Sequence, residues 1–273
     1  MNSKVIFLDW GIFMYRSIFC WERTRAVPPT YTAMSMVIAC LKLIDLTPED
    51  VIIIAVDSYK GSWRREVDSN YKANRKADRA KHLDIDWDTQ FRKFNELLEN
   101  ISSSTPFHVI VIDKLEADDI IAYGVRYFKD SECVIISTDS DYEQLVVFNN
   151  VKLFSPVSKK YKIVKDPHKI LARKIVKETS DNLVTPITTQ EQYEKRKKIV
   201  SLIQLPEEVE YKIKQALKKL DFKKDFKLEN LRSKSIKNRF MQIYNNDNIV
   251  TISDSFGKKR KRRKKQSIAQ LEL

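Results

Sequence analysis

The stretch that decides the fold is VIIIAVD at residues 51–57, an uninterrupted apolar run that ends in an aspartate. Three similar runs lie elsewhere in the chain: VIFLD at 5–9, HVIVID at 108–113 and CVIISTD at 133–139. Continuous apolar runs of this length are typical of strands buried on both faces of a parallel sheet. Segments with helical patterning lie between them, at 30–44, 86–100 and 116–129. Strands that alternate with helices predict an α/β fold with a doubly wound, mostly parallel sheet.

The sheet pattern fades after residue 150. We expect a small edge hairpin from VKLFS and KYKIV, and helices at 166–177 and 190–220 that Pro206 interrupts. Residues 221–256 are polar and of mixed pattern, and GKKRKRRKK is a like-charge run that predicts disorder without a partner. We therefore expect a catalytic core at 1–178, a small helical C-terminal region at 179–256 and a basic tail at 257–273.

Composition narrows the class of protein. With 42% hydrophobic residues among 273, the chain supports a real core, and only four glycines rule out glycine-rich nucleotide loops. Three widely spaced cysteines favour neither a disulfide framework nor a zinc cluster. The sequence has no signal peptide or membrane-span pattern, so we expect an intracellular, soluble protein without a membrane partner.

Positive charge gathers in two zones. The chain carries a formal +13, of which residues 258–273 hold a net +7 and residues 59–81 a net +5. The remainder is close to neutral. Because solubility alone needs no clustering, these zones indicate a polyanionic partner, and nucleic acid is the natural one.

Acidic residues follow the predicted strands. Asp9, Asp57 and Asp139 stand at strand ends, and in open parallel sheets ligands bind beyond those ends. The other members of the group open the next helix or follow the last strand: Glu116, Asp118, Asp119 and Asp141. Any single one is explained as a helix cap. Seven together would repel one another unless divalent cations were bound.

The donor set indicates which cation. Hard oxygen ligands without His or Cys favour Mg²⁺, which Mn²⁺ can replace, and the three histidines are scattered. Two such ions roughly 3.5–4 Å apart suit in-line phosphodiester cleavage. No Ser/His/Asp or Cys/His arrangement offers a protein nucleophile.

Four short segments resemble the 5′-nuclease, or flap endonuclease, family with its PIN-like core. They are IFLDWG at 6–11, VDSYKGSWRREVDSNYKANR at 56–75, LEADDIIA at 115–122 and ISTDSDYEQL at 136–145. Their order and spacing most resemble the branch of the family that T-even phages use as a ribonuclease H and 5′→3′ exonuclease. The resemblance implies a metal-dependent nuclease acting on RNA–DNA hybrid, flap or duplex DNA, which removes RNA primers in phage DNA replication.

The resemblance also implies residue roles. The first metal would use Asp9, Asp57, Glu116, Asp118 and Asp119. The second would use Asp139 and Asp141, with Glu178 and Asp181 carried over from KETSDN at 177–182. Residues 59–81 would form the helical arch, in which Tyr71 stacks on a base while Lys72 and Arg75 contact the scissile phosphate. Arg64 would act near the metals, and the nucleic acid would meet Arg65, Lys72, Arg75, Lys76 and Arg79.

The sequence departs from the family after SDN at 180–182. The expected duplex-binding element is replaced by VTPITTQEQYEKRKKIV, which is shortened and contains no glycine, so we expect a partner or the basic tail to aid DNA binding. QLEL at 270–273 weakly resembles a sliding-clamp peptide, and a single-strand-binding protein is a second candidate partner. The resemblance places the protein in the cytoplasm of an infected bacterium. A PIN-like ribonuclease on single-stranded RNA and a non-catalytic DNA-binding accessory remain open.

Overall fold

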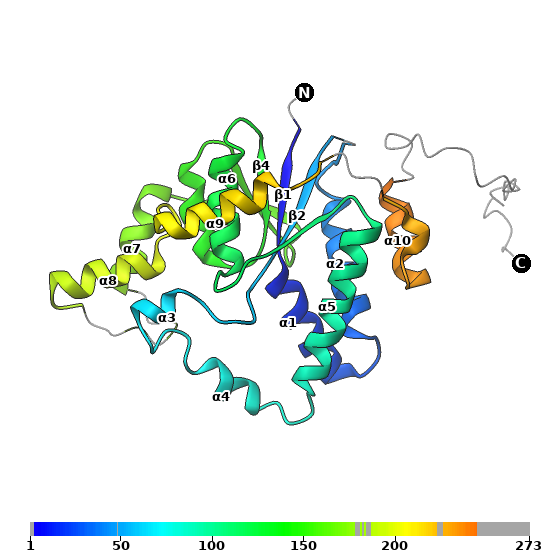
Figure 1. Ribbon diagram of the computed structural model, residues 1–273, viewed down its shortest axis with the longest axis horizontal. Coiled ribbons are helices and arrows are strands. Elements are labelled where there is room, and N and C mark those ends of the chain that lie inside the picture. The colour runs from blue at the N-terminus through cyan, green and yellow to red at the C-terminus, as the bar shows by residue number, and fades with distance from the viewer. Residues whose placement is uncertain are drawn as a thin grey trace, which may run out of the picture.

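The computed structural model describes residues 3–47, 49–177, 181, 183, 187–222 and 226–244. Within these residues a six-stranded sheet has the order β3-β2-β1-β4-β5-β6 (Figure 1). The strands are β1 Val5–Asp9, β2 Val51–Val56, β3 His108–Val111, β4 Cys133–Ile136, β5 Val151–Ser155 and β6 Lys160–Lys162. Strand β1, the first in the chain, pairs with both β2 and β4 in the interior of the sheet.

The sheet is mostly parallel, as the sequence predicts. Strands β1 to β5 run in the same direction, and only β6 is antiparallel to its neighbour β5. The hairpin expected at residues 151–162 forms, but its first strand also extends the parallel sheet, since Val151 pairs with Cys133. All four apolar runs quoted above are strands, and their carboxyl ends meet at one edge.

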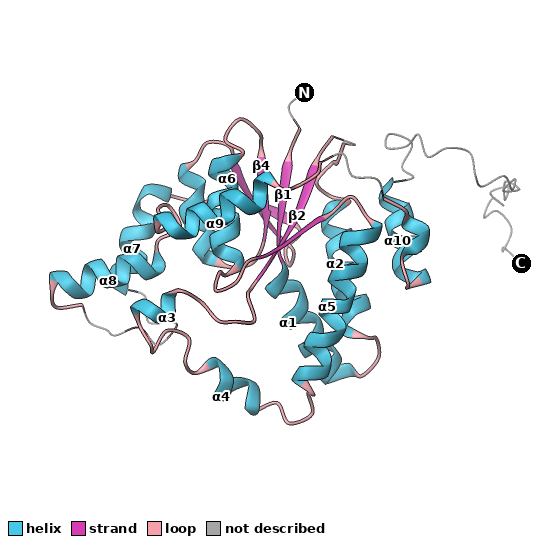
Figure 2. Cartoon of the chain, viewed as in Figure 1, coloured by secondary structure: helices cyan, strands magenta, loops and turns pink. Residues whose placement is uncertain are grey.

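Helices lie in the connections between β1 and β4 and in the chain that follows β6 (Figure 2). They are α1 Trp10–Thr24, α2 Pro29–Leu41, α3 Arg64–Val67, α4 Arg75–Ala80, α5 Trp87–Ser104, α6 Ala117–Tyr127, α7 Ile170–Lys177, α8 Gln190–Val200, α9 Glu207–Lys218 and α10 Lys234–Tyr244. Three 3₁₀ helices accompany them: η1 Ser140–Val147, η2 Pro167–Lys169 and η3 Leu228–Asn230. The predicted break at Pro206 is confirmed, because α9 begins directly after it. The sequence patterns did not predict helices α1 and α10.

Alternating strand residues build two cores, one on each face of the sheet. Ile6 and Leu8 of β1 point toward the layer of α1, α2, α5 and α10. Val5 and Phe7 point to the other face, where α6 and α9 pack. The two helical layers lie on opposite sides of the sheet in Figure 1. The described helices after residue 179 thus cover both faces, with α9 against α6 and α10 against α2.

The approach of α6 to the sheet depends on a glycine. A Cβ atom at Gly124 would lie 2.6 Å from Cε1 of the fully buried Phe7 ring. Since real side chains do not come that close, the helix rests on β1 only because position 124 lacks a side chain. This packing helps to fix the first turn of α6, which carries three of the predicted acids. Among the described residues, no helix is both long and apolar enough to cross a membrane.

Candidate active site

Four of the predicted carboxylates line one cavity of ≈ 440 Å³, together with Asp78 of α4. Asp9 ends β1, Asp57 follows β2, Asp118 lies in the first turn of α6, and Asp139 precedes η1. They meet because parallel strands release their chains at the same edge of the sheet. The convergence expected from the sequence is therefore present for these four residues.

A second grouping overlaps the first. Carboxylate oxygens of Asp118, Asp139 and Asp141 all lie within 4.8 Å of one another, a spacing that one cation can contact. Asp139 and Asp141 are joined locally, because Asp139 Oδ1 accepts the Asp141 backbone N–H at 2.8 Å. Asp118 belongs to both groups and so stands between them.

Neutral donors hold three of these carboxylates in place. The Ser137 hydroxyl donates to Asp9 at 2.8 Å, and the Tyr142 hydroxyl donates to Asp118 at 2.7 Å. The backbone N–H of Ala117 donates to Asp57 at 2.8 Å, so that the N-terminus of α6 orients the end of β2. Neutral donors fix the side chains but leave their negative charge uncompensated.

The electrostatics of the cavity favour a bound cation. Burial, followed by the charge of Asp57, raises the pKa of Asp9 to about 7. Burial likewise raises the pKa of Asp118 well above its usual range, and it raises the pKa of Asp139 with the Asp141 charge as a second cause. Without a positive partner, ionisation of these carboxyls is disfavoured. A divalent cation would remove that conflict.

Glu116 has the opposite environment. Its carboxylate accepts from Lys72 Nζ at 2.7 Å, from Arg64 Nη1 at 2.9 Å and from the Tyr71 hydroxyl at 3.0 Å. Burial alone would raise its pKa, but the charges of Lys72 and Arg64 outweigh burial and lower it to about 2. Glu116 is therefore ionised and already neutralised by residues of the arch segment.

Lys72 and Arg75, which the family resemblance places in the helical arch, both line the acidic cavity of ≈ 440 Å³. Both also line a second cavity of ≈ 390 Å³. Burial would lower the pKa of Lys72, but the Glu116 carboxylate raises it above its ordinary value, so the ammonium stays charged. Arg75 Nη2 lies 3.7 Å from Asp181 Oδ1 and is half exposed.

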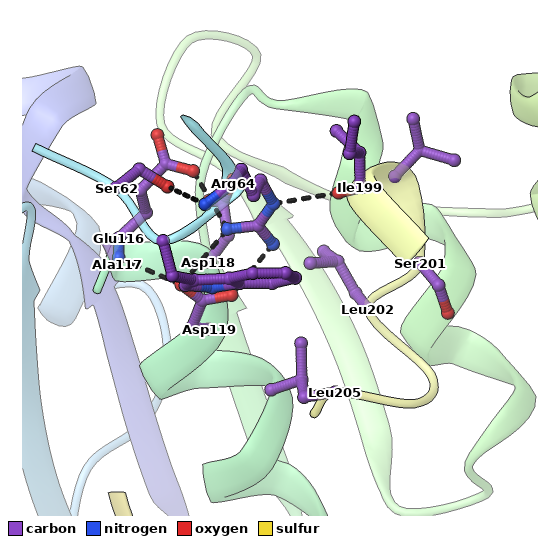
Figure 3. Close-up of polar contacts among 12 residues, drawn as sticks. Ser62, Arg64, Glu116, Ala117, Asp118, Asp119, Ile199, Ser201, Leu202 and Leu205 are labelled. Atoms are coloured by element: carbon purple, nitrogen blue, oxygen red, sulfur yellow. Dashed lines mark hydrogen bonds and ion pairs between the residues drawn. The ribbon is translucent and has the colours of Figure 1, made fainter. Parts of the chain in front are cut away.

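Arg64 is a buried residue with several polar partners (Figure 3), and it is not among the residues that line the ≈ 440 Å³ cavity. Only 2% of its side chain is exposed, and its Nη2 lies 2.8 Å from Asp119 Oδ1. Its Nε donates to the Ile199 carbonyl at 2.8 Å, which joins the end of α8 to the start of α6. With Glu116 as a further partner, the guanidinium is already engaged by the protein. These contacts favour a positioning role for Arg64, which also borders a small pocket with Asp118 and Asp141.

Asp119 also needs correction. It is fully buried, and its Oδ2 accepts from the Trp63 indole at 3.1 Å and from the Glu116 backbone N–H at 3.0 Å. Together with the Arg64 ion pair, these contacts point the carboxylate into the protein. Asp119 does not line the acidic cavity. The sequence assigned it to the first metal, but the structure makes it the support for Arg64 and for the start of α6.

Tyr71 is placed differently from the base-stacking role expected of it. Tyr71 is 5% exposed and packs with Leu183 and Ile199, while its hydroxyl donates to Glu116. It borders the ≈ 390 Å³ cavity with only this small exposed surface. Tyr71 instead fixes the start of the arch against the body of the protein.

The remaining arch cations differ in their surroundings. Arg79 lines both cavities, with Nη1 donating to the Tyr15 hydroxyl at 3.5 Å. Arg65 lines the second cavity and donates to the Lys72 carbonyl at 3.4 Å. Lys76 is exposed on α4, the short helix between α3 and α5 in Figure 1. These positions are compatible with nucleic-acid contact and do not test it.

The end of the acidic motif is partly described. Asp181 borders a small pocket with Asp118 and Asp141, and burial raises its pKa. Its backbone carbonyl accepts the Lys72 N–H at 3.0 Å, which ties this segment to the arch. Glu178, the basic tail and QLEL lie outside the described residues.

Sequence reasoning missed four residues that shape the site: Ser137, Tyr142, Trp63 and Lys174. Ser137 and Tyr142 flank Asp139 and Asp141 within a few residues, so their proximity could have indicated them. Trp63 lies beside Arg64, and nothing in the sequence indicates that its indole reaches Asp119, 56 positions away. Lys174 lies in α7 and bonds Asp141. Distant pairings of this kind appear only in the fold.

A parallel α/β sheet with carboxylates at its strand ends and basic residues above them defines a resolvase-like nuclease fold. A family model described as "5'-3' exonuclease, N-terminal resolvase-like domain" matches residues 4–195. The chain belongs to this family, which confirms the resemblance seen in the four short segments. The family also accounts for the mostly parallel sheet.

Individual relatives agree with this assignment. Ribonuclease H of Enterobacteria phage T4 is 37% identical over 117 residues, which cover 42% of this chain and 38% of that protein. A 5'-3' exonuclease of Mycoplasmopsis pulmonis is 32% identical over 149 residues, covering 53% of this chain and 46% of that protein. The chain thus aligns with less than half the length of these two relatives.

A solved structure confirms the fold. The flap endonuclease of bacteriophage T5, in a pseudo-enzyme–product complex with DNA and metal ions, has a TM-score of 0.55 and 19% identity. The match covers 90% of this chain and 95% of that one. At this identity the likeness establishes the shared architecture, including the predicted mostly parallel sheet.

Proposed function

We propose that this protein is a divalent-metal-dependent 5′→3′ exonuclease and flap endonuclease that hydrolyses phosphodiester bonds. The observation that carries the proposal is the ≈ 440 Å³ cavity, where Asp9, Asp57, Asp118 and Asp139 lie together with Lys72 and Arg75. Carboxylates at one wall and cations above them suit a phosphate held between metal ions and basic side chains. Family membership supports the same reaction class.

The residues present fit two Mg²⁺ ions. All the candidate ligands are carboxylate oxygens, which suit Mg²⁺ or Mn²⁺, and the raised pKa of Asp9 reflects a charge that a cation would stabilise. Asp9, Asp57 and Asp118 would hold the first ion with help from Glu116, and Asp139 and Asp141 the second, with Asp181 and Glu178 as outer partners. Bound there, the ions would activate water and offset charge on the scissile phosphate.

The protein side chains contribute placement of the substrate. Lys72 is fixed by Glu116 at 2.7 Å before any substrate arrives, so its ammonium is preorganised near the acidic cavity. The more exposed Arg75 has a planar fork suited to a phosphate oxygen pair. Arg65, Lys76 and Arg79 extend positive charge along the arch segment, where we place the path of the nucleic-acid backbone.

We further propose RNA–DNA hybrid, flap and duplex DNA as substrates, with primer removal during phage DNA replication as the role. The name of the phage T4 relative, ribonuclease H, supports the hybrid, and the DNA in the T5 complex supports the flap or duplex. The site of action would be the cytoplasm of an infected bacterium. A sliding clamp or single-strand-binding protein, together with the basic tail, would increase the affinity for DNA. We retain the division into a core at 1–178, helices at 179–256 and the tail at 257–273.

The test compares three 5′-labelled substrates: a DNA flap, an RNA–DNA hybrid and single-stranded RNA. We expect Mg²⁺-dependent cleavage of the first two, which EDTA abolishes. Asp118→Asn and Asp139→Asn should remove cleavage while DNA binding persists, because they lose a metal ligand and keep the cations of the arch. Cleavage confined to single-stranded RNA would favour the PIN-like ribonuclease instead. DNA binding with no Mg²⁺-dependent cleavage of any substrate would favour the accessory role.

A further inference from the structure

We propose that Lys174 is an internal counter-ion of the second acidic group and weakens binding of the second divalent cation. The inference rests on the proposed metal-dependent function, since it concerns the same carboxylates. It predicts two unequal metal sites, with one cation bound tightly and the other opposed by a lysine.

The Lys174 side chain reaches from α7 into the acidic group. Its ammonium forms an ion pair with Asp141 Oδ1 and lies 3.2 Å from the Ser140 hydroxyl. Only 12% of the side chain is exposed, although a surface lysine would normally remain in water. Helix α7 packs against η1, which places the lysine beside the carboxylates.

The carboxylate that Lys174 binds is one that a second cation would need. Asp141 forms, with Asp118 and Asp139, the set whose oxygens lie within 4.8 Å of one another. Lys174 also borders the small pocket that Asp118, Asp141 and Asp181 line. A cation entering this set would meet an ammonium already bonded to one of its ligands.

The first acidic group lacks such a partner. Among the described residues, no ion pair joins Asp9 or Asp57 to a lysine or arginine, and their hydrogen bonds come from neutral donors. A divalent cation held by Asp9, Asp57 and Asp118 displaces no internal cation, since Lys72 and Arg64 pair with Glu116 and not with these three residues. The first ion should therefore bind before the second, because only the second has to displace or tolerate Lys174.

Movement of the Lys174 ammonium would allow the second cation to bind. The four-carbon stem of this lysine is flexible, and the Ser140 hydroxyl is a second acceptor within reach. When the second cation binds, the ammonium is free to shift along η1 while Asp141 turns to the metal. A substrate phosphate, which carries negative charge into the cavity, would favour that exchange. The second ion would then bind more tightly in the presence of nucleic acid.

The experiment measures Mn²⁺ binding to the full chain by the electron paramagnetic resonance signal of free Mn²⁺. Wild type should show one tight and one weak site. Lys174→Met, which keeps the stem and removes the charge, should tighten the weak site by roughly tenfold or more. Lys174→Arg keeps the charge and should leave that site weak. Asp139→Asn should eliminate the weak site, which identifies it.

Lys162→Met is the matched control. Lys162 pairs with Glu143 on the same 3₁₀ helix at 2.5 Å, outside the acidic group. Its loss removes a more exposed ion pair to the same 3₁₀ helix and should leave both Mn²⁺ affinities unchanged. Two sites in wild type with unchanged or weaker second-site affinity in Lys174→Met would overturn the inference alone. No Mn²⁺ bound by wild type at all would instead overturn the proposed function.

Discussion

Replacing Arg64 with methionine would test how the site is held together. Methionine fills much of the same space but supplies no charge or donor. The change leaves Asp119 fully buried with no ion-pair partner, and it removes one of three donors from Glu116. Glu116 keeps Lys72 and Tyr71, so most of the cost should fall on Asp119.

The magnitude follows from the protonation that the variant permits. A buried carboxylate without a partner can take up a proton, and for an ordinary aspartate this costs about 4 kcal/mol at pH 7, from a pKa of about 3.9 and about 1.4 kcal/mol for each pH unit. At pH 5 the same cost is about 1.5 kcal/mol. Because a carboxylate takes up a proton more easily at lower pH, the loss of stability should be smaller at pH 5 than at pH 7. The expected loss agrees with the ~3–5 kcal/mol typical of breaking a buried pair.

Urea unfolding followed by circular dichroism measures this loss, in EDTA and at both pH values. Arg64→Met/Asp119→Asn should recover most of the lost free energy, because the neutral amide needs no counter-ion. Arg92→Met is the control, since Arg92 pairs with Glu96 on the exposed side of α5 and should contribute less than about 0.5 kcal/mol. A loss in Arg64→Met below about 1 kcal/mol, or one equal at pH 5 and pH 7, would refute this account of the network.

Three further predictions concern the cavity and the core. Asp9→Asn should stabilise the metal-free protein above pH 7 by about 1–3 kcal/mol and have little effect at pH 4. The reason is that the Asp9 pKa of about 7 makes ionisation of this carboxyl costly between those pH values. The same variant should lose most of the rise in melting temperature that Mg²⁺ gives the wild-type protein. Lys72→Ala should slow single-turnover cleavage more than it raises the Kd for DNA, and an equal effect on both would make Lys72 a binding residue only. Gly124→Ala should lower the free energy of unfolding by about 1–2 kcal/mol, since the new Cβ would clash with the Phe7 ring, and a neutral or stabilising effect would contradict the packing described.

The sheet was predictable because its signal is local. VIIIAVD and the related runs are too apolar for any position but a buried strand, and the residues that follow them are fixed by chain direction. Helix α1 was not predictable in the same way, because it begins at Trp10 directly after β1 with no loop to mark it. Helix α10 lies in a polar stretch, and only its packing against α2 gives Ile236 and Phe240 a core to enter.

The candidate site likewise contains residues that a local sequence signal identifies and residues whose roles depend on distant contacts. Strand-end positions identified Asp9, Asp57 and Asp139, because the edge of a parallel sheet brings such residues together. On the helix, Asp118 and Asp119 are equivalent in the sequence but differ by about 100° in direction. Asp118 faces the cavity, while Asp119 faces Arg64. No pattern of residue types distinguishes these neighbours, since the partner of Asp119 lies 55 positions away.

Charge balance connects these assignments. Asp119 and Glu116 are neutralised inside the protein by Arg64 and Lys72, and Asp141 is neutralised by Lys174. Among the described residues, this leaves four predicted carboxylates of the acidic cavity without an ion-pair partner: Asp9, Asp57, Asp118 and Asp139. When all four are ionised, two divalent cations would balance their charge. When only one divalent cation is bound, part of the negative charge of these carboxylates is not neutralised. Lys174 can offset it only through its ion pair with Asp141. Binding of the second cation is therefore the step that the protein itself can regulate. That regulation would act through the ion pair between Lys174 of α7 and Asp141 of η1.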